Sequence, residues 1–198
     1  MYFGEIPSLE SLRIAPLMSG IENKVMNQQA FFATGCFWGA ERRFWNLPGV
    51  IKTSVGYMGG HSSDPTYKEV CSGTTDHAET VEVLFDPEKI SYQRLLEEFW
   101  TMHDPTSLNR QGGDIGTQYR SAIFTTNEEQ MIAAINTREI YNDELKREGF
   151  DDIVTEIQVA AEHTYWLAEE YHQRYLEKNP DGYDCHSTTG IAFPKVIQ

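Results

Sequence analysis

Apolar and polar residues follow one another in patterns that predict short strands and helices between residues 28 and 178. Residues 78–85 alternate as a half-buried strand does, and Asp86-Pro87 ends that run. Thr126 and Glu129 have the spacing of a capping box, which we expect to start a long helix. The whole pattern predicts strands at 28–33, 50–57, 78–85, 119–125 and 153–160, helices at 36–45, 91–102, 126–148 and 167–178, and one helical turn at 67–71.

The first six of these elements have the order β-α-β-β-α-β, which is the ferredoxin-like order. The sequence therefore predicts an α+β fold, a two-layer sandwich with additional helices and an irregular tail at 180–198. Right-handed crossovers place the third strand antiparallel beside the first, and the fourth on the other side of the first. We expect one catalytic domain at 28–198, preceded by a poorly ordered extension at 1–27.

This topology collects chemically useful residues at one edge of the sheet. The first strand ends there before Cys36, the third strand starts there with Glu79, and the loop at 57–76 leaves the second strand there. Asp114 and Tyr119 lie near the predicted start of the fourth strand. Since loops on a rigid scaffold are where sites are built, this edge is the candidate active site.

Cys36 lies where the first strand gives way to the first helix, in the run Gly-Cys-Phe-Trp-Gly at 35–39. The unpaired N–H groups and positive dipole of a helix start favour a thiolate, whereas an ordinary cysteine is only a few per cent ionised at neutral pH. Phe37 and Trp38 would line one side of the sulfur with apolar surface. A buried structural cysteine is the alternative, because cysteine is among the most buried residue types.

Glu79 shares a strand face with Val81, Val83 and Phe85. A carboxyl group on an apolar face loses hydration, which raises its pKa toward neutrality and allows it to act as a general acid. The alternative is a solvated glutamate at a fraying strand end.

Composition narrows the class of protein. Of 198 residues, 23% are charged and 40% hydrophobic, which is an ordinary globular composition, and the net charge of −14 argues against nucleic-acid binding. No apolar run approaches the ~20 residues of a membrane span, and residues 1–27 do not have the pattern of a signal peptide. Three cysteines without framework spacing favour a reducing, cytoplasmic location.

The remaining polar residues give weaker signals. The histidines and cysteines do not have metal-ligand spacing, so we predict no metal site. The glycine-rich segment 111–116 does not open a helix, and we interpret it as a wall of the site rather than a phosphate loop. Tyr57, Tyr67 and Tyr119 can each donate a hydrogen bond at the sheet edge, while His163 and His172 are predicted at the surface.

Five motifs in order resemble those of the A-type peptide methionine sulfoxide reductases, and the resemblance runs from about residue 31 to 182. They are Gly-Cys-Phe-Trp-Gly at 35–39, Gly-Tyr-Met-Gly-Gly at 56–60, Pro-Thr-Tyr at 65–67, His-Ala-Glu at 77–79 and Gly-Thr-Gln-Tyr-Arg-Ser at 116–121. The resemblance implies reduction of the S epimer of methionine sulfoxide, free or in proteins, with thioredoxin or another dithiol as reductant and no bound cofactor. It also implies repair of oxidative damage, and we expect a monomer.

The resemblance also implies roles for individual residues. Cys36 is the nucleophile, Phe37 and Trp38 pack around the substrate methyl group, and Glu79 protonates the departing oxygen. Tyr67 and Tyr119 hydrogen-bond that oxygen, and Asp114 supports the site. Attack leaves Cys36 as a sulfenic acid, with which a second thiol can condense to a disulfide.

The tail departs from a common family pattern, in which a cysteine directly follows Gly-Tyr. Here Asp184 separates Tyr183 from Cys185, and no cysteine follows. Cys185 is therefore the predicted resolving cysteine, since an irregular tail can bring its sulfur to Cys36. Cys71 is the other candidate, and we expect it to be buried in its short apolar turn.

Two other functions fit parts of the sequence. Cys36 could be the nucleophile of a cysteine hydrolase, activated by His77 or His186 and oriented by Asp114. The aromatic residues after Cys36 could instead form a binding pocket for methionine-containing peptides without catalysis. A hydrolase needs no reductant, and a binding domain consumes no thiol, so the redox stoichiometry separates all three functions.

Overall fold

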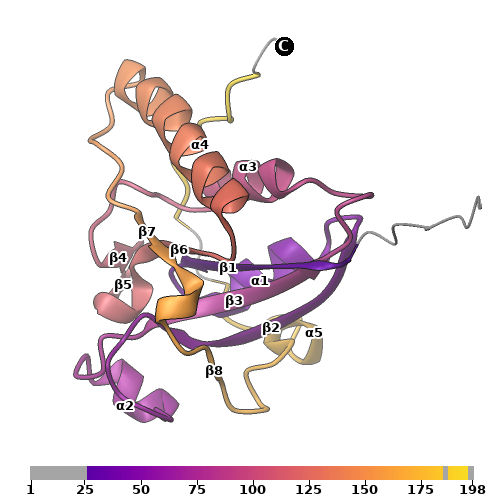
Figure 1. The fold of residues 1–198 in the computed structure, drawn as a ribbon. Coiled ribbons are helices and arrows are strands. Elements are labelled where there is room, and N and C mark those ends of the chain that lie inside the picture. Colours follow the sequence, from indigo (N-terminus) through magenta and orange to yellow (C-terminus); the bar gives the residue numbers. More distant parts are fainter. Residues whose placement is uncertain (1–25, 185–186, 196–198) are drawn as a thin grey trace, which may run out of the picture.

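The computed structural model describes residues 26–184 and 187–195, and its centre is a six-stranded sheet (Figure 1). The sheet has the order β7-β6-β1-β3-β2-β8, and β4 and β5 pair separately. The strands are β1 Gln28–Thr34, β2 Val50–Met58, β3 Ala78–Phe85, β4 Arg110–Gln111, β5 Asp114–Ile115, β6 Ser121–Thr125, β7 Glu156–Val159 and β8 Trp166–Leu167. The helices are α1 Phe37–Trp45, α2 Tyr67–Cys71, α3 Tyr92–Met102, α4 Glu128–Arg147 and α5 Tyr175–Lys178, with 3₁₀ turns η1 Thr117–Tyr119 and η2 Ala160–Glu162.

The predicted α+β topology is confirmed. β1 pairs antiparallel with β3 on one side and with β6 on the other, and β7 adds to β6 in parallel. Helices α1 and α3 cover the same face of the sheet, because Phe44 and Phe99 both pack on the ring of Phe32. Ring-to-ring distances are 4.9 Å and 5.5 Å. α4 packs on α3, and the Trp100 indole N–H donates to Thr137 Oγ1 at 2.9 Å.

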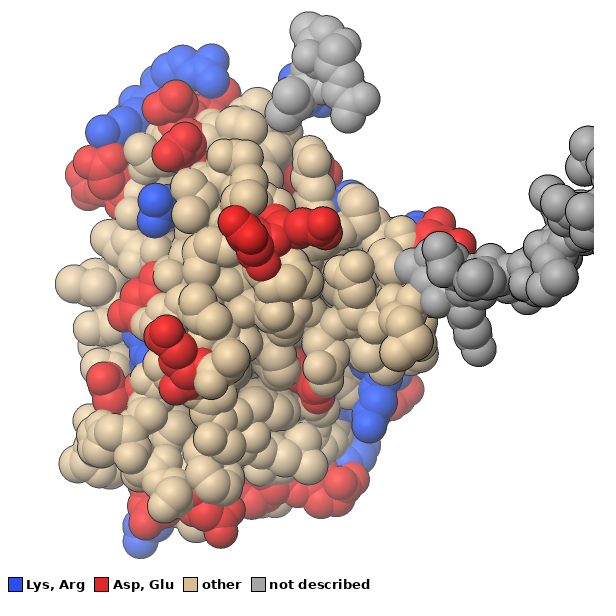
Figure 2. Space-filling view, viewed as in Figure 1, with Lys and Arg blue, Asp and Glu red and all other residues tan. Residues whose placement is uncertain are grey.

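The opposite face of the sheet has a smaller apolar cluster, formed by Phe31, Met58 and Phe124 with Tyr165 packed against it. Tyr165 lies in the connection between β7 and β8, which crosses in front of the sheet in Figure 1. Successive residues of β1 therefore point alternately into two apolar clusters, one on each face of the sheet. Acidic side chains are scattered over the face seen in Figure 2, and basic ones gather near its edges.

The helix predicted at 126–148 begins later than expected, and the predicted capping box is wrong. Asn127 is the N-cap, and its side chain accepts the N–H of Gln130 at 2.9 Å. The hydroxyl of Thr126 instead donates to the backbone oxygen of Gln29 at 3.3 Å. Because the Thr126 side chain contacts β1, it does not cap the helix.

The helix predicted at 167–178 is also wrong over most of its length. Trp166 and Leu167 form β8 at the edge of the sheet, and helix appears only at Tyr175–Lys178. Arg174 has a φ of +52°, a left-handed conformation that interrupts any continuous right-handed helix. Contacts of this segment with β2 and α1 outweigh its helical spacing of apolar residues.

Candidate active site

Cys36 occupies the junction between β1 and α1 and is 6% exposed. It is the N-cap of α1, one position before the helical turn in which the sequence placed it. Gly35 precedes it with a φ of +97°, a region that favours glycine. A Cβ on Gly35 would lie 2.6 Å from Cγ of Gln111, so the backbone before the thiol is packed directly against the β4 strand.

Glu79 lies beside this junction, on the second residue of β3, and is 2% exposed. Its Oε2 accepts the backbone N–H of Phe37 at 3.0 Å. Burial raises the pKa of Glu79 from 4.5 to about 8, the Phe37 hydrogen bond opposes that shift, and the charge of Asp114 adds to it. The raised pKa expected from the strand pattern is therefore found, and the carboxyl group is mostly protonated at neutral pH.

Asp114 and Tyr119 reach the same place from the segment between α3 and β6. The sequence put them at the start of a strand, whereas Asp114 lies in the β4–β5 hairpin and Tyr119 in η1. The pKa of Tyr119 is raised by burial first, and then by the charges of Glu79 and Asp114. Asp114 Oδ1 accepts the Tyr183 hydroxyl at 3.2 Å, while its buried Oδ2 has no hydrogen-bond partner in the described part of the chain.

Tyr67 starts the short helix α2, which forms over the predicted residues. Thr66 caps it by a capping box with Glu69. Burial raises the pKa of Tyr67, with further contributions from the Cys71 thiol and the charge of Glu79. The expectation that Cys71 is buried is wrong, because this residue is exposed at the end of α2.

Phe37 and Trp38 form an aromatic wall next to Cys36. Phe37 is 1% exposed and packs on Tyr57 with ring centres 6.0 Å apart. Trp38 stacks on Tyr175 at 3.8 Å, and its indole N–H donates to Nδ1 of His172 at 3.0 Å. The indole is thus held on one face by a ring and at its edge by a hydrogen bond.

The surface position predicted for His172 is wrong, since this residue is fully buried. Its ring packs on Phe37 at 5.1 Å and on Tyr67 at 4.5 Å. Burial lowers the pKa of His172, which favours the neutral ring that the Trp38 hydrogen bond requires at Nδ1. The apolar spacing of 167–178 is helical, and no local signal marked either this residue or Glu169 as part of the site.

Cys185 lies outside the described residues, together with residue 186. On one side of this gap, Asp184 pairs with Arg42 of α1, and Tyr183 donates to Asp114. On the other side, a Cβ on Gly112 would lie 3.3 Å from Cβ of Ser187. The described chain on both sides of the gap therefore lies against α1 or the β4–β5 hairpin, which also border Cys36.

His77 is engaged elsewhere. Its Nδ1 accepts the N–H of Gly60 at 3.1 Å, so the proton lies on Nε2, which donates to the Ser62 carbonyl at 2.7 Å. Both ring nitrogens thus hold the loop after β2. The described residues contain no group of three or more side chains suited to hold a metal ion.

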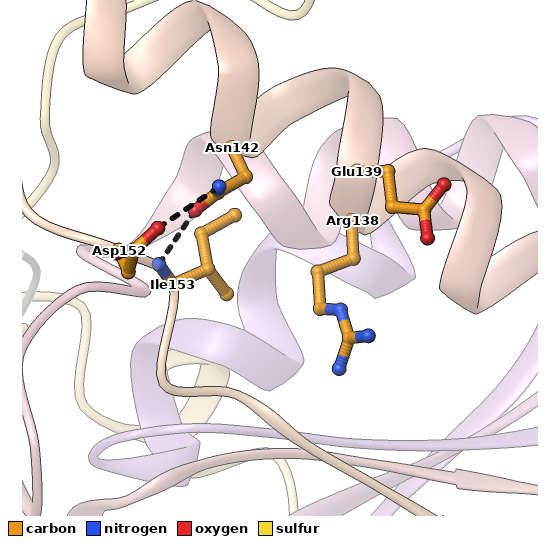
Figure 3. Close-up of a pocket in the computed structure, with 5 residues that line it drawn as sticks. All are labelled: Arg138, Glu139, Asn142, Asp152 and Ile153. Atoms are coloured by element: carbon orange, nitrogen blue, oxygen red, sulfur yellow. Dashed lines mark hydrogen bonds between the residues drawn. The ribbon is translucent and has the colours of Figure 1, made fainter.

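A cavity of about 330 Å³ beside α4 is separate from this site (Figure 3). In it, Asn142 donates to Asp152 at 3.2 Å and accepts the N–H of Ile153 at 2.8 Å. Arg138 and Glu139 complete its lining. These contacts hold the chain after α4 against the helix. We therefore interpret the cavity as part of a structural junction and not as part of the site around Cys36.

Residues 28–197 match the family model described as peptide methionine sulfoxide reductase. The chain is 54% identical over 169 residues to peptide methionine sulfoxide reductase MsrA of Salinispora arenicola, covering 84% of this chain and 76% of that protein. It is 53% identical over 171 residues to the human mitochondrial peptide methionine sulfoxide reductase, covering 86% and 72%.

Solved structures agree with the sequence matches. Methionine sulfoxide reductase A of Corynebacterium diphtheriae superposes with a TM-score of 0.77 at 41% identity, over 87% of this chain and 85% of that one. Reduced Mxr1 from Saccharomyces cerevisiae gives a TM-score of 0.73 at 34% identity, over 84% and 94%. With the family model, these matches establish that the chain belongs to the peptide methionine sulfoxide reductases, oxidoreductases that reduce methionine sulfoxide.

Proposed function

We propose that this enzyme reduces the S epimer of methionine sulfoxide through a Cys36 sulfenic acid and then a Cys36–Cys185 disulfide, which thioredoxin or another dithiol reduces. The observation that carries the proposal is the Glu79 carboxyl group. It is buried, its pKa is raised to about 8, and it is bonded to the N–H that directly follows Cys36. An acid that stays protonated at neutral pH beside a thiol is what reduction of an S–O bond requires.

The reaction begins with attack of the Cys36 thiolate on the sulfoxide sulfur. Glu79 delivers its proton to the oxygen as negative charge develops there. The substrate S–O bond and the new bond between the two sulfurs then break as an S–O bond forms on Cys36. Methionine is released and Cys36 is left as a sulfenic acid, so the substrate sulfur is reduced by two electrons and Cys36 is oxidised by two. Among the described residues, hydrogen bonds use Oε2 of Glu79 and none uses Oε1, which can therefore carry the proton.

The tyrosines and aromatic residues hold the substrate in this scheme. Tyr67 and Tyr119 donate hydrogen bonds to the sulfoxide oxygen, and their raised pKa values keep both hydroxyls protonated. Phe37 and Trp38 pack on the methyl group. Asp114 supports the site by raising the pKa of Glu79.

Recycling requires a second thiol. The Cys185 thiol attacks the sulfenic sulfur of Cys36, water leaves, and a disulfide forms. Thioredoxin reduces that disulfide by thiol exchange, so one dithiol is oxidised for each methionine sulfoxide reduced. The pairing of Asp184 with Arg42 supports this role, because it holds the residue before Cys185 against the helix that Cys36 caps.

The substrates we propose are protein-bound and free methionine sulfoxide, which makes the enzyme a repair activity against oxidative damage. The cytoplasmic location and the monomeric state stay predictions from the sequence. None of the helices in the described ranges is long and apolar enough to span a bilayer.

Separated epimers test the proposal. Purified enzyme is given peptides with the S or the R epimer of methionine sulfoxide, with thioredoxin or dithiothreitol as reductant, and methionine and disulfide are measured. We expect turnover of the S epimer with one reductant oxidised per methionine formed. Equal turnover of the R epimer, or product without consumption of thiol, would contradict the proposal and reopen the hydrolase or binding functions.

A further inference from the structure

The carboxylate of Glu169 joins two parts of the site that are far apart in the sequence. Its Oε1 accepts the backbone N–H of Tyr67 at 2.8 Å, and its Oε2 accepts the hydroxyl of Tyr57 at 2.8 Å. Nε2 of the buried His172 lies 3.9 Å from Oε2. A single side chain therefore contacts β2, the start of α2 and the histidine behind the aromatic wall.

Glu169 is charged in this position. Burial works against the charge, but the Tyr67 N–H and the Tyr57 hydroxyl hold the pKa of this carboxyl below its ordinary value. Charge-assisted hydrogen bonds are shorter and about twice as strong as neutral ones. The two contacts are thus strong restraints on whatever they hold.

Both partners of Glu169 are close to the chemistry. Tyr57 is fully buried, pairs directly with Glu79 across β2 and β3, and packs on Phe37. Tyr67 takes its position from the first N–H of α2, a helix of only five residues that stands in a long loop. A short helix has little stability of its own, so the Glu169 contact adds to the capping box of Thr66 and Glu69 and to the packing on His172 in fixing where the Tyr67 ring lies.

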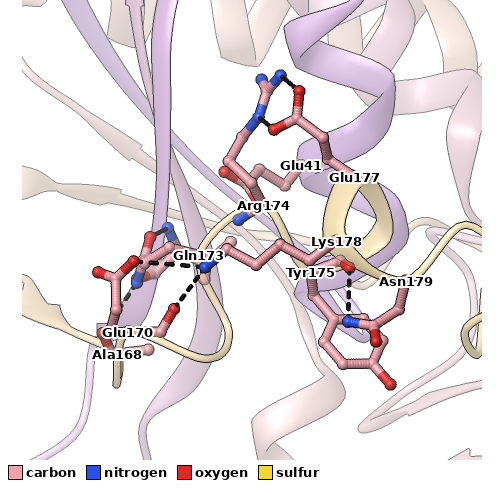
Figure 4. Close-up of polar contacts among 10 residues, drawn as sticks. Glu41, Ala168, Glu170, Gln173, Arg174, Tyr175, Glu177, Lys178 and Asn179 are labelled. Carbon is pink, nitrogen blue, oxygen red and sulfur yellow. Dashed lines mark hydrogen bonds and ion pairs between the residues drawn. The ribbon is translucent and has the colours of Figure 1, made fainter.

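The segment that carries Glu169 is itself fastened to the body of the protein (Figure 4). The Gln173 amide accepts the N–H of Val55 at 2.9 Å and donates to its C=O at 2.8 Å. The N–H of Arg174 donates to the buried Glu41 at 2.9 Å. The backbone that carries Glu169 is therefore held in place, and the side chain contacts Tyr57 and Tyr67 from a fixed position.

We propose that Glu169 is a positioning residue of the reductase step, which holds the Tyr67 hydroxyl where it meets the sulfoxide oxygen. This inference rests on the proposed function and names the residue on which the placement of Tyr67 depends. Glu169 does not touch the substrate. It acts through the backbone of Tyr67, and through Tyr57 it ties that placement to the strand facing Glu79.

The test is a double-mutant cycle in single-turnover release of methionine, using Glu169→Ala, Tyr67→Phe and the two together. We expect Glu169→Ala to slow release about 10- to 100-fold, the range for a misplaced reacting group. In the Tyr67→Phe background the same change should cost less than about threefold, because the hydroxyl it positions is already gone. Glu170→Ala is the matched control, since Glu170 is exposed and contacts Lys178, and it should react at the wild-type rate.

A wild-type rate for Glu169→Ala, or losses that multiply in the double variant, would overturn the inference. Should Glu169→Ala fail to fold, Glu169→Gln gives the same comparison, because its amide keeps the shape and one acceptor. It should show a smaller loss that again disappears without the Tyr67 hydroxyl. Failure of the proposed function is distinguished within the same set, since the wild type itself would then release no methionine from the S epimer. A wild-type rate for Tyr67→Phe would instead remove the role of its hydroxyl and overturn the inference.

Discussion

Replacing Glu79 by Gln removes the proposed proton donor while keeping the size of the side chain and its contact with the backbone. The amide oxygen can still accept the N–H of Phe37, which now bonds to Oε2 at 3.0 Å. The amide cannot release a proton to the sulfoxide oxygen. We expect Glu79→Gln to slow the reductase step by about 100- to 10,000-fold, the usual contribution of a general acid.

The raised pKa determines how that step depends on pH. With a pKa of about 8, roughly 90% of Glu79 is protonated at pH 7, against about 0.3% at the ordinary value of 4.5. Burial therefore supplies about 300 times more acid at neutral pH. Above pH 8 the protonated fraction falls about tenfold per pH unit, and the contribution of the acid falls with it.

The assay is single-turnover release of methionine from a peptide with the S epimer, with sulfenic acid trapped in parallel, between pH 5 and 10. The wild-type rate should decline on the alkaline side with an apparent pKa near 8. Glu79→Gln should be slow and lack that decline. Glu82→Gln is the control, because Glu82 lies on the same strand but bonds to Gln29 and Ser54.

Two results in Glu79→Gln, and one in the control variant, would refute this reasoning. One is a Glu79→Gln variant that releases methionine as fast as the wild type at pH 7. The other is an alkaline decline that persists in that variant, which would assign the titration to a different group. An equal loss in Glu82→Gln would show that the substitution acts through the strand rather than the acid.

Three further results are expected. Cys36→Ser should retain less than about 1% of turnover with the fold intact by circular dichroism, since a serine hydroxyl is a far weaker nucleophile, and greater activity would remove Cys36 as the nucleophile. Cys185→Ser should release one methionine per enzyme, stop as a Cys36 sulfenic acid and lose thioredoxin-supported turnover. Cys71→Ser should turn over normally. A Cys36–Cys71 disulfide found by mass spectrometry, without a Cys36–Cys185 disulfide, would exchange the two assignments. Because native Glu79 binds its proton more tightly than the unfolded chain does, the free energy of unfolding should fall as pH rises from 4.5 to about 8, by up to about 5 kcal/mol, and a Glu79→Gln variant with the same slope in denaturant titrations would contradict the raised pKa.

The central part of the fold could be predicted because its signals are local. The apolar residues of β3 alternate with polar ones, and those of α3 have helical spacing, because these residues face the core. Each pattern lies within a few consecutive turns or residue pairs of the sequence. Once these elements are known, handedness rules place β1 between β3 and β6. Cys36 and Glu79 follow from that placement, because the end of β1 and the start of β3 meet at one edge.

The segment 166–174 could not be predicted, because distant residues decide its conformation. Gln173 bonds to Val55, and Glu169 bonds to Tyr57 and Tyr67, all more than 100 positions away. Such contacts stabilise an irregular chain that helix propensity alone would not select. Trp166 and Leu167 likewise become a strand only because β2 offers a free edge beside them.

A comparison of Glu41 in α1 with Glu79 in β3 shows why a buried carboxyl group does not by itself identify an acid. Glu41 is fully buried, and burial raises its pKa, as it does for Glu79. Both oxygens of Glu41 are used, one by the Thr53 hydroxyl at 2.9 Å and one by the N–H of Arg174 at 2.9 Å. Glu41 therefore fastens the segment that carries Glu169. Glu79 accepts one N–H, from the residue after Cys36, and its second oxygen is available for the role of acid that we propose. The difference between a structural and a reactive carboxyl group therefore lies in their partners rather than in their burial.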